Sequence, residues 1–302
     1  MEVAKTNLLS YRLLLMASLL VLPTIFIPAL AQSDSLHHVN KSRLHFVVIG
    51  SGVTYTGAMI GLSSVWYSQY DKEPFHFFND FHEWKQLDKV GHFYSAFQVS
   101  SMGSRALQWS GVAPKKSDIA GALAGFAIIS SIEILDGFSA GYGASASDLA
   151  FNAMGAGFYL GQKMAWKEIR IHPKFSFHTT VYAPQRPDVL GSTLLEQVVK
   201  DYNGQTYWLS VDVDKFVTFP KWLNISVGYG AEDMLYARDE DNEANNLNPY
   251  RQFYIGLDFD VSHLRCRSKF ANSLLYFVNM IKIPGPTLEF SNGKIKGHFL
   301  YF

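Results

Sequence analysis

Residues 119–152 read IAGALAGFAIISSIEILDGFSAGYGASASDLAFN, and this stretch decides the fold. Glu133 and Asp136 close an apolar run, a connection rich in Gly and Ser follows, and Asp148 and Asn152 open a second apolar run. Residues three or four apart share one helix face, so the side chains of each polar pair point the same way. The stretch therefore predicts two antiparallel helices with both polar pairs at their joined ends.

A third polar pair lies earlier in the chain, where Asp88 and His92 flank Lys89 at the start of a helix predicted over about 87–109. Short connections make neighbouring helices antiparallel, so the three helix ends that carry polar pairs should meet at one end of the bundle. We therefore expect one polar cluster as the candidate binding site. Its members are Asp88, Lys89, His92, Glu133, Asp136, Asp148 and Asn152.

Four helices are expected in this half of the chain, over about 44–67, 87–109, 119–135 and 147–167. The first contains 24 residues without Asp, Glu, Lys or Arg. That length spans a hydrocarbon core of about 30 Å at about 1.5 Å per residue. We expect an antiparallel four-helix bundle over residues 44–170 that is embedded in a membrane.

Pairs of glycines one helical turn apart support the membrane hypothesis, because they allow helix backbones to approach closely. Three of the expected helices carry such a pair: Gly57 and Gly61, Gly121 and Gly125, Gly157 and Gly161. Tight packing within a water-soluble helical domain is the alternative interpretation.

Residues 1–31 have the pattern of a secretory signal peptide, with an uncleaved anchor helix as the alternative. Lys5 and Arg12 precede the apolar run Leu13–Leu22, and Ala29-Leu30-Ala31 before Gln32 fits the small-residue cleavage rule. The basic residues of the bundle fall on the side that the positive-inside rule places in the cytoplasm, whereas a cleaved signal leaves the new N-terminus outside. We therefore expect an exported envelope protein in the outer membrane or periplasm rather than in the inner membrane.

The pattern changes after Pro173 to the alternation of strands, and the chain is predicted to be α+β with an antiparallel, β-rich C-terminal domain over residues 174–302. The terminal sequence Phe299-Leu300-Tyr301-Phe302 is typical of the closing strand of outer-membrane barrels, although a small sheet packed on the bundle fits equally well. The expected strands cover Phe175–Ala183, Thr206–Val213, Leu223–Tyr229, Phe253–Val261 and Lys294–Phe302.

Composition excludes two classes of function. The 26 basic and 26 acidic residues give a net charge of zero, so no global field attracts nucleic acid. Cys266 is the single cysteine, which excludes a cysteine-based metal site within one chain. The acidic segment Ala237–Asn248 is interpreted as a solvated hairpin loop, with a calcium loop as the alternative.

The chemistry of the polar cluster leaves three hypotheses open. His92, Glu133 and Asp148 form a reasonable ligand set for a divalent metal ion, with Asp88 or Asp136 supporting them. The two helix N-termini, together with Lys89 and His92, could instead bind an anion such as a lipid phosphate. The third hypothesis is structural: the acids stabilise helix starts, and His92 bonds Glu133 across the bundle.

Asp88-Lys89 with His92-Phe93, Glu133 with Asp136, and Asp148-Leu149 with Asn152 resemble the YfiM-like domain of unknown function, described as predicted periplasmic lipoproteins. The same residues are more loosely similar to VanZ-type membrane proteins. The resemblance covers about residues 85–165 and implies a small helical envelope domain without an assigned activity. The chain lacks a lipobox cysteine and adds a first helix and the β-rich half, as in longer versions from Bacteroidetes-type bacteria.

Two functions follow as expectations. In the first, the protein is a non-enzymatic envelope component whose cluster has a structural role or binds an ion or a lipid headgroup, with membrane lipid as the partner. In the second, it is a membrane hydrolase or transferase acting on a lipid or cell-wall intermediate, with His92 and Glu133 as acid and base. The cofactor expected in either case is a divalent metal ion.

Overall fold

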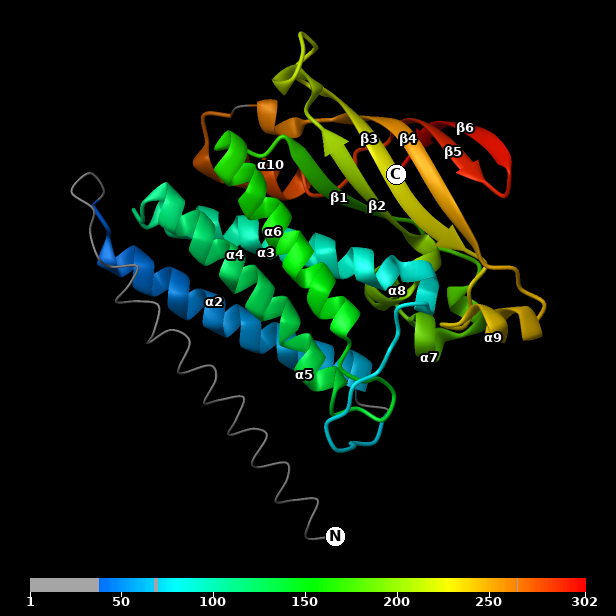
Figure 1. Ribbon diagram of the computed structural model, residues 1–302. Coiled ribbons are helices and arrows are strands. Elements are labelled where there is room, and N and C mark those ends of the chain that lie inside the picture. The colour runs from blue at the N-terminus through cyan, green and yellow to red at the C-terminus, as the bar shows by residue number, and fades with distance from the viewer. Residues whose placement is uncertain (1–37, 68–69, 265) are drawn as a thin grey trace.

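The computed structural model describes residues 38–67, 70–264 and 266–302 and shows an α+β protein (Figure 1). Helices dominate the first half and a six-stranded antiparallel sheet forms the second, which confirms the predicted class. The expected signal peptide over residues 1–31 lies outside the described residues.

The helices of the first half form what we call the helical layer. α3 lies at its centre and packs against both α4 and α6 (Figure 1). Within the described residues, two stretches are long and apolar enough to cross a membrane, namely α2 and residues 114–136. The elements are α2 Lys41–Leu62 with the π-helical turn η1 Ser63–Tyr67, α3 Leu87–Trp109, α4 Pro114–Ser130, α5 Ile132–Asp136 and α6 Ala146–Trp166.

Two helix boundaries differ from those expected from the sequence. α2 begins before residue 44 because the Asn40 side chain caps it by accepting a hydrogen bond from the Arg43 backbone N–H at 3.0 Å. The helix expected over 119–135 begins at Pro114, whose fixed φ suits a first helical position, and it is interrupted at Ser131. Local capping chemistry thus shifts these limits by several residues.

The glycine pairs do not all act as expected. A Cβ atom on Gly121 would lie 2.6 Å from the Ser100 carbonyl oxygen, so this glycine permits the close contact between α4 and α3. Gly57, Gly61, Gly157 and Gly161 have no atom within 4 Å of a Cβ position, apart from their own neighbourhood. The interpretation as helix-packing pairs is therefore wrong for α2 and α6, because those glycines face away from neighbouring helices.

The sheet is a meander in which each strand pairs antiparallel with the next, in the order β1 to β6. The expected first strand ends six residues early, and the strand β5 was missed. β5 has only a short alternation after Pro284, so its sequence signal is weak. The strands are β1 Ile171–Phe177, β2 Gln205–Val211, β3 Leu223–Glu232, β4 Tyr250–Phe259, β5 Gly285–Ser291 and β6 Lys294–Tyr301.

Short helices occupy the connections. The acidic segment expected to be an open loop contains α9, and the buried Asn242 side chain fixes the start of this helix by hydrogen bonds with the backbone of residues 235–238. The remaining elements are α7 Pro187–Leu190, α8 Leu194–Lys200, α9 Asp239–Ala244, α10 Lys269–Val278 and the 3-10 turns η2 Glu83–Gln86, η3 Ala183–Gln185, η4 Tyr202–Gly204, η5 Val213–Lys215 and η6 Val261–His263.

The outer face of β1 and β2 packs on α3. Tyr94 of α3 lies with its ring 6.0 Å from that of Phe175 and 5.8 Å from that of Tyr207. The opposite, inner face is enclosed by curling of the sheet, since Lys174 on β1 reaches Asp258 on β4 at 2.7 Å. The sheet therefore has a helix-covered outer edge and a closed interior.

Candidate functional site

The polar cluster forms where the first turns of α3 and α6 meet α5. Asp88 and Asp148 both lie in the first turn of their helices, and Ser145 caps α6 by accepting a hydrogen bond from the Asp148 N–H at 3.2 Å. Acids at these positions interact favourably with the positive end of the helix dipole. The helix ends thus carry the cluster as the spacing of the polar pairs predicts.

Lys89 is the positive centre of the cluster and is 1% exposed. Its ammonium group lies 2.7 Å from Asp80 Oδ2, 2.9 Å from Asp88 Oδ2 and 2.7 Å from Asp148 Oδ1. Three carboxylates therefore surround one amine. This geometry leaves Lys89 little capacity to bind an external anion.

His92 is held in a defined orientation. Its Nδ1 lies 3.0 Å from Asn152 Oδ1, and an amide oxygen only accepts, so Nδ1 carries the proton. Nε2 then points toward Asp88 Oδ1 at 3.9 Å, Glu133 Oε1 at 3.8 Å and Asp148 Oδ2 at 3.9 Å. These separations are too long for direct hydrogen bonds. The expected bond between His92 and Glu133 is therefore not formed.

Glu133 is buried, and its two oxygens have different surroundings. Oε2 accepts a hydrogen bond from the Ser145 N–H at 2.9 Å, whereas Oε1 has no hydrogen-bond partner among the described residues. A buried carboxylate oxygen without a partner is costly. Asp136 accepts a hydrogen bond from the Tyr67 hydroxyl at 2.6 Å.

The charges of the cluster shift the pKa values of Asp88 and His92, which both lie on α3. Burial lowers the pKa of His92, but the charges of Asp88, Asp148 and Glu133 outweigh it and raise the pKa above its usual value. Burial raises the pKa of Asp88, but the charges of His92 and Lys89 outweigh burial, so the pKa lies below its usual value. This pair favours an imidazolium beside a carboxylate.

The pKa values of Asp148 and Lys89 are both raised. Burial, followed by the charge of Asp88, raises the pKa of Asp148 to about 7. Burial lowers the pKa of Lys89, but Asp88 and Asp148 raise it above its usual value. The cluster therefore holds more protons near neutral pH than separate groups in water would hold.

Two cluster members were not identified from the sequence. Asp80 lies in an irregular segment where helical spacing gives no information, and it binds Lys89 and accepts a hydrogen bond from Ser145 Oγ at 2.6 Å. Tyr202 belongs to η4, beyond β1, and donates a hydrogen bond to Asp88 Oδ1 at 2.7 Å. The sequence shows Asp80 as an acidic residue, but no helical spacing relates it to the other residues of the cluster.

The Gly- and Ser-rich connection over 137–147 is paired with an earlier segment. Bridges join Lys72 to Ser139 and Phe77 to Ala144, and the Phe78 N–H donates to the Ala144 carbonyl oxygen at 3.0 Å. The connection and this earlier segment thus lie side by side. The connection lies beside the cluster, and backbone contacts hold it there.

Metal-ligating atoms gather at one point within the described residues. One ligand atom each from Asp88, His92 and Asp148 lies within 4.8 Å of the other two. The ligand set predicted from the sequence had Glu133 in place of Asp88, and Glu133 Oε1 lies nearby, facing His92 Nε2. One imidazole nitrogen and several carboxylate oxygens suit a divalent ion such as Mn²⁺, Fe²⁺ or Zn²⁺.

Comparison with known protein families identifies a match to part of the chain. Residues 76–161 match the model of a family described as predicted periplasmic lipoprotein, DUF2279. This segment contains Asp80 and all of the predicted cluster residues, and the description fits an envelope protein. No curated protein and no solved structure is significantly similar to the chain.

Proposed function

We propose that this protein is a non-enzymatic component of the bacterial cell envelope that binds one divalent metal ion at the polar cluster. The observation that carries the proposal is the carboxylate oxygen Oε1 of Glu133, which is buried, lacks a hydrogen-bond partner among the described residues, and faces an oriented imidazole nitrogen. A cation placed between them would satisfy both groups.

Charge balance supports this proposal. Asp80, Asp88, Glu133 and Asp148 supply four carboxylates, and among the described residues Lys89 is the lysine that pairs with three of them, Asp80, Asp88 and Asp148. A neutral His92 would present the lone pair of Nε2 to three of these acids. Buried negative charge in excess of positive charge is costly unless a cation or protons compensate it.

Asn152 is the second support, because it performs the usual role of a residue behind a metal ligand. It accepts the Nδ1 proton of His92 at 3.0 Å and donates to Ser130 Oγ at 3.3 Å. Such bonds fix the tautomer and ring orientation of ligating histidines. The same geometry disfavours the lipid-phosphate hypothesis, since the acids would repel an anion.

Membrane association is part of the proposal. α2 is 22 residues long with a mean hydropathy of 1.3, and only 11% of its most apolar stretch is buried. Phe46, Ile49 and Val53 on this helix are each at least 65% exposed. We infer that α2 contacts lipid, and that the protein resides at the outer membrane or in the periplasm, where the positive-inside rule for inner-membrane insertion does not apply.

The hydrolase or transferase hypothesis has less support. A reacting substrate needs a hollow of ligand size next to the catalytic groups. The hollow of about 400 Å³ found on this protein is lined by residues of β4, β5 and β6 and their turn, and none of them belongs to the cluster. We assign His92 and Glu133 to binding rather than to acid–base chemistry, because the imidazole nitrogen and the carboxylate oxygens converge on one point that suits a cation.

Metal titration tests the proposal. Protein purified in detergent is stripped with a chelator and titrated with Mn²⁺, with bound ion followed by electron paramagnetic resonance. We expect one ion per chain, and at least a tenfold loss of affinity in His92→Ala and Glu133→Gln. His172→Ala is the matched control, because His172 also faces an aspartate, Asp212, at 3.1 Å but lies in the sheet.

Equal affinity in wild type and His92→Ala would place the ion elsewhere and refute the proposed site. Absence of binding by folded wild-type protein, repeated with Zn²⁺, would refute the metal and leave the imidazolium of His92 as the counter-ion. Circular dichroism of each variant separates loss of binding from loss of folding.

A further inference from the structure

The sheet has its polar and apolar faces reversed relative to a water-soluble sheet. On β3, Asn224 and Ser226 are buried, while the alternating Ile225 and Val227 are 40% and 48% exposed. β4 repeats the pattern, and its apolar residues Phe253, Ile255 and Leu257 are exposed while Gln252, Tyr254 and Asp258 are buried. Strands with polar residues inside and apolar residues outside are typical of sheets that face lipid.

The inner face can be polar because its groups are paired. Ser210 donates to Asp258 Oδ2 at 2.6 Å, and Asn224 Nδ2 donates to Ser210 Oγ at 3.1 Å. Farther along, Glu289 accepts a hydrogen bond from Ser291 Oγ at 2.5 Å and pairs with His298 Nε2 at 2.8 Å. Paired polar side chains therefore fill the inner face, and the apolar side chains that alternate with them form the outer face.

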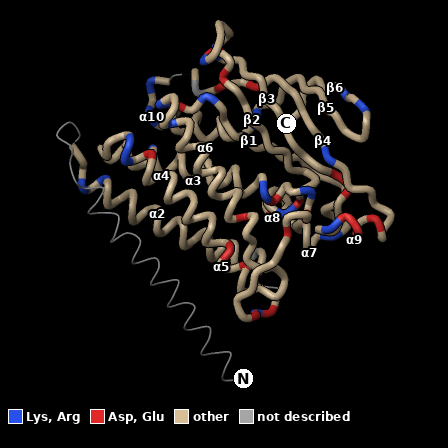
Figure 2. The backbone as a smooth tube through the Cα atoms, in the orientation of Figure 1, with Lys and Arg blue, Asp and Glu red and all other residues tan. Residues whose placement is uncertain are grey.

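The exposed apolar rows on the outer face follow the strand register. One row contains Val227 on β3, Ile255 on β4 and Leu288 on β5, and the next contains Phe253, Phe290 and Ile295. Between these rows Glu289 of β5 is buried on the inner face, and its register partner Lys296 on β6 pairs with it at 3.2 Å. Figure 2 shows the middle of β3 and β4 without Lys, Arg, Asp or Glu on the tube and charged residues near their ends.

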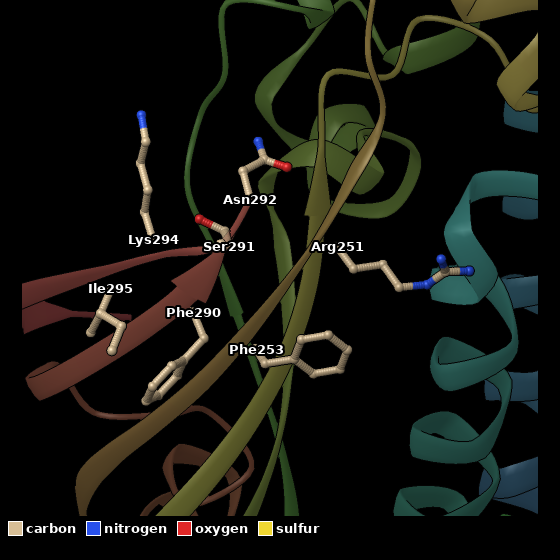
Figure 3. Close-up of a pocket in the computed structure, with 8 residues that line it drawn as sticks. Arg251, Phe253, Phe290, Ser291, Asn292, Lys294 and Ile295 are labelled. Carbon is tan, nitrogen blue, oxygen red and sulfur yellow. The ribbon is translucent and has the colours of Figure 1, made fainter.

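Both ends of this surface have boundaries of the kind found at membrane interfaces. At one end, Phe253 and Phe290 are followed by Arg251 and Lys294, which line the hollow of about 400 Å³ (Figure 3). Figure 3 also shows Arg251 reaching toward the helical layer, where it donates to Gln86 Oε1 at 2.6 Å. Aromatic residues followed by cations are typical of the edge of an apolar band.

At the other end, Trp222 stacks on Phe259 with ring centroids 5.9 Å apart. The outward residues of β4 from Phe253 to Phe259 are six positions apart, which at about 3.4 Å per residue gives about 20 Å. The apolar band of outer-membrane sheets is about 25 Å tall. The height of the surface therefore agrees with contact to one hydrocarbon layer.

We propose that the outer face of β3 to β6 contacts the acyl chains of a lipid bilayer. A second copy of this chain or another protein could also cover an apolar face with a polar rim. The order seen here, with aromatic residues followed by cations along the strands, is the order found at the edge of a bilayer, and it favours lipid as the occupant. α2 exposes apolar side chains on the helical layer as well, so lipid would contact both halves of the protein. The inference concerns the sheet and does not depend on the metal site.

Site-directed spin labelling tests this inference on the full chain. In a Cys266→Ser background, Ile255→Cys and Leu288→Cys place a nitroxide on the outer face, and Glu240→Cys on α9 is the water-exposed control. Each labelled protein is reconstituted into phosphatidylcholine vesicles, and collisions with O₂ and with a water-soluble nickel chelate are measured. Oxygen concentrates in hydrocarbon, whereas the chelate stays in water.

We expect the labels at residues 255 and 288 to collide several-fold more with O₂ than with the chelate, and the label at residue 240 to show the reverse. Strong collisions with the chelate at both sheet positions would place the face in water and overturn the inference. Spectral broadening by spin–spin contact would show a second copy on the face, and immobilisation with access to neither reagent would show a protein partner. Either result would also overturn it.

Discussion

The two halves of the molecule bury charge in opposite ways. Inside the sheet, Lys174 and Asp258 are both 0% exposed and form one ion pair at 2.7 Å. Lys174 also donates to Asn279 Oδ1 at 3.1 Å and to the Phe259 carbonyl oxygen at 3.2 Å. At the helix ends, Lys89 is shared by three acids, and Glu133 Oε1 lacks a partner among the described residues.

This difference separates structural polarity from polarity that is available for binding. Lys174 and Asp258 neutralise each other and both are hydrogen-bonded, so this pair serves to hold the sheet together rather than to bind a ligand. The helix-end cluster has more acids than cations and an imidazole aimed at them. Removing one acid should therefore have opposite consequences in the two places.

The largest effect is expected from breaking the closed pair. Asp258→Ala leaves Lys174 buried without its counter-ion and should lower the free energy of unfolding by about 3–5 kcal/mol. Chemical unfolding followed by tryptophan fluorescence measures the change. The double variant Lys174→Met/Asp258→Leu removes both charges and should recover most of the loss. A single variant as stable as wild type would show that the pair is not closed.

An intermediate effect is expected from pH at the cluster. The pKa values of His92, Asp148 and Glu133 are raised in the folded protein, so the folded cluster binds more protons than the same groups in the unfolded chain. The stability that the cluster contributes to the metal-free protein should therefore begin to fall above the ordinary carboxyl pKa of about 4 and continue to fall as pH rises through about 7 and 8. We expect the thermal midpoint to fall by about 4 °C between pH 6 and pH 8.

The pH effect has a direct control. Added Mn²⁺ should abolish most of the fall, because a bound cation replaces the protons that the cluster holds. A midpoint that rises with pH in chelator would contradict the direction of the shifts. His92→Ala in chelator should show a smaller fall than wild type, since one of the groups with a raised pKa is gone.

The smallest effect has the opposite sign to the first. Glu133→Gln keeps the shape of the side chain and its acceptor for the Ser145 N–H but removes one negative charge from a buried cluster. Burial and the charge of Asp148 raise the pKa of Glu133 to about 8, so the charge is fully present only above that pH. In chelator at about pH 9 we expect a gain in the free energy of unfolding of about 1 kcal/mol, because like charges repel at close range. Chemical unfolding under the conditions used for Asp258→Ala compares the two directly. A loss as large as that of Asp258→Ala would show that the two regions bury charge in the same way.

The sequence by itself predicted the secondary structure and most of the cluster for a physical reason: periodicity is local. Helical spacing placed Asp88 with His92 and Glu133 near Asp148, and alternation identified most strands of the sheet. The same local signals could not find Asp80, which lies in an irregular segment, or show that Asp136 is bonded by Tyr67. Glycine spacing alone also failed to distinguish Gly121, where an added Cβ atom would meet α3, from Gly57, where it would meet no other element.

Only the tertiary structure decided which face of each element is covered. Alternation along β4 is equally clear whichever face is inside, and the inner position of Asp258 follows from Lys174 reaching it across the curled sheet. Likewise, Tyr202 joins Asp88 from 114 residues away because the sheet packs on α3. Spacing fixes which side chains point together along one element, whereas contacts between distant elements decide whether those side chains are paired, buried or left to bind a ligand.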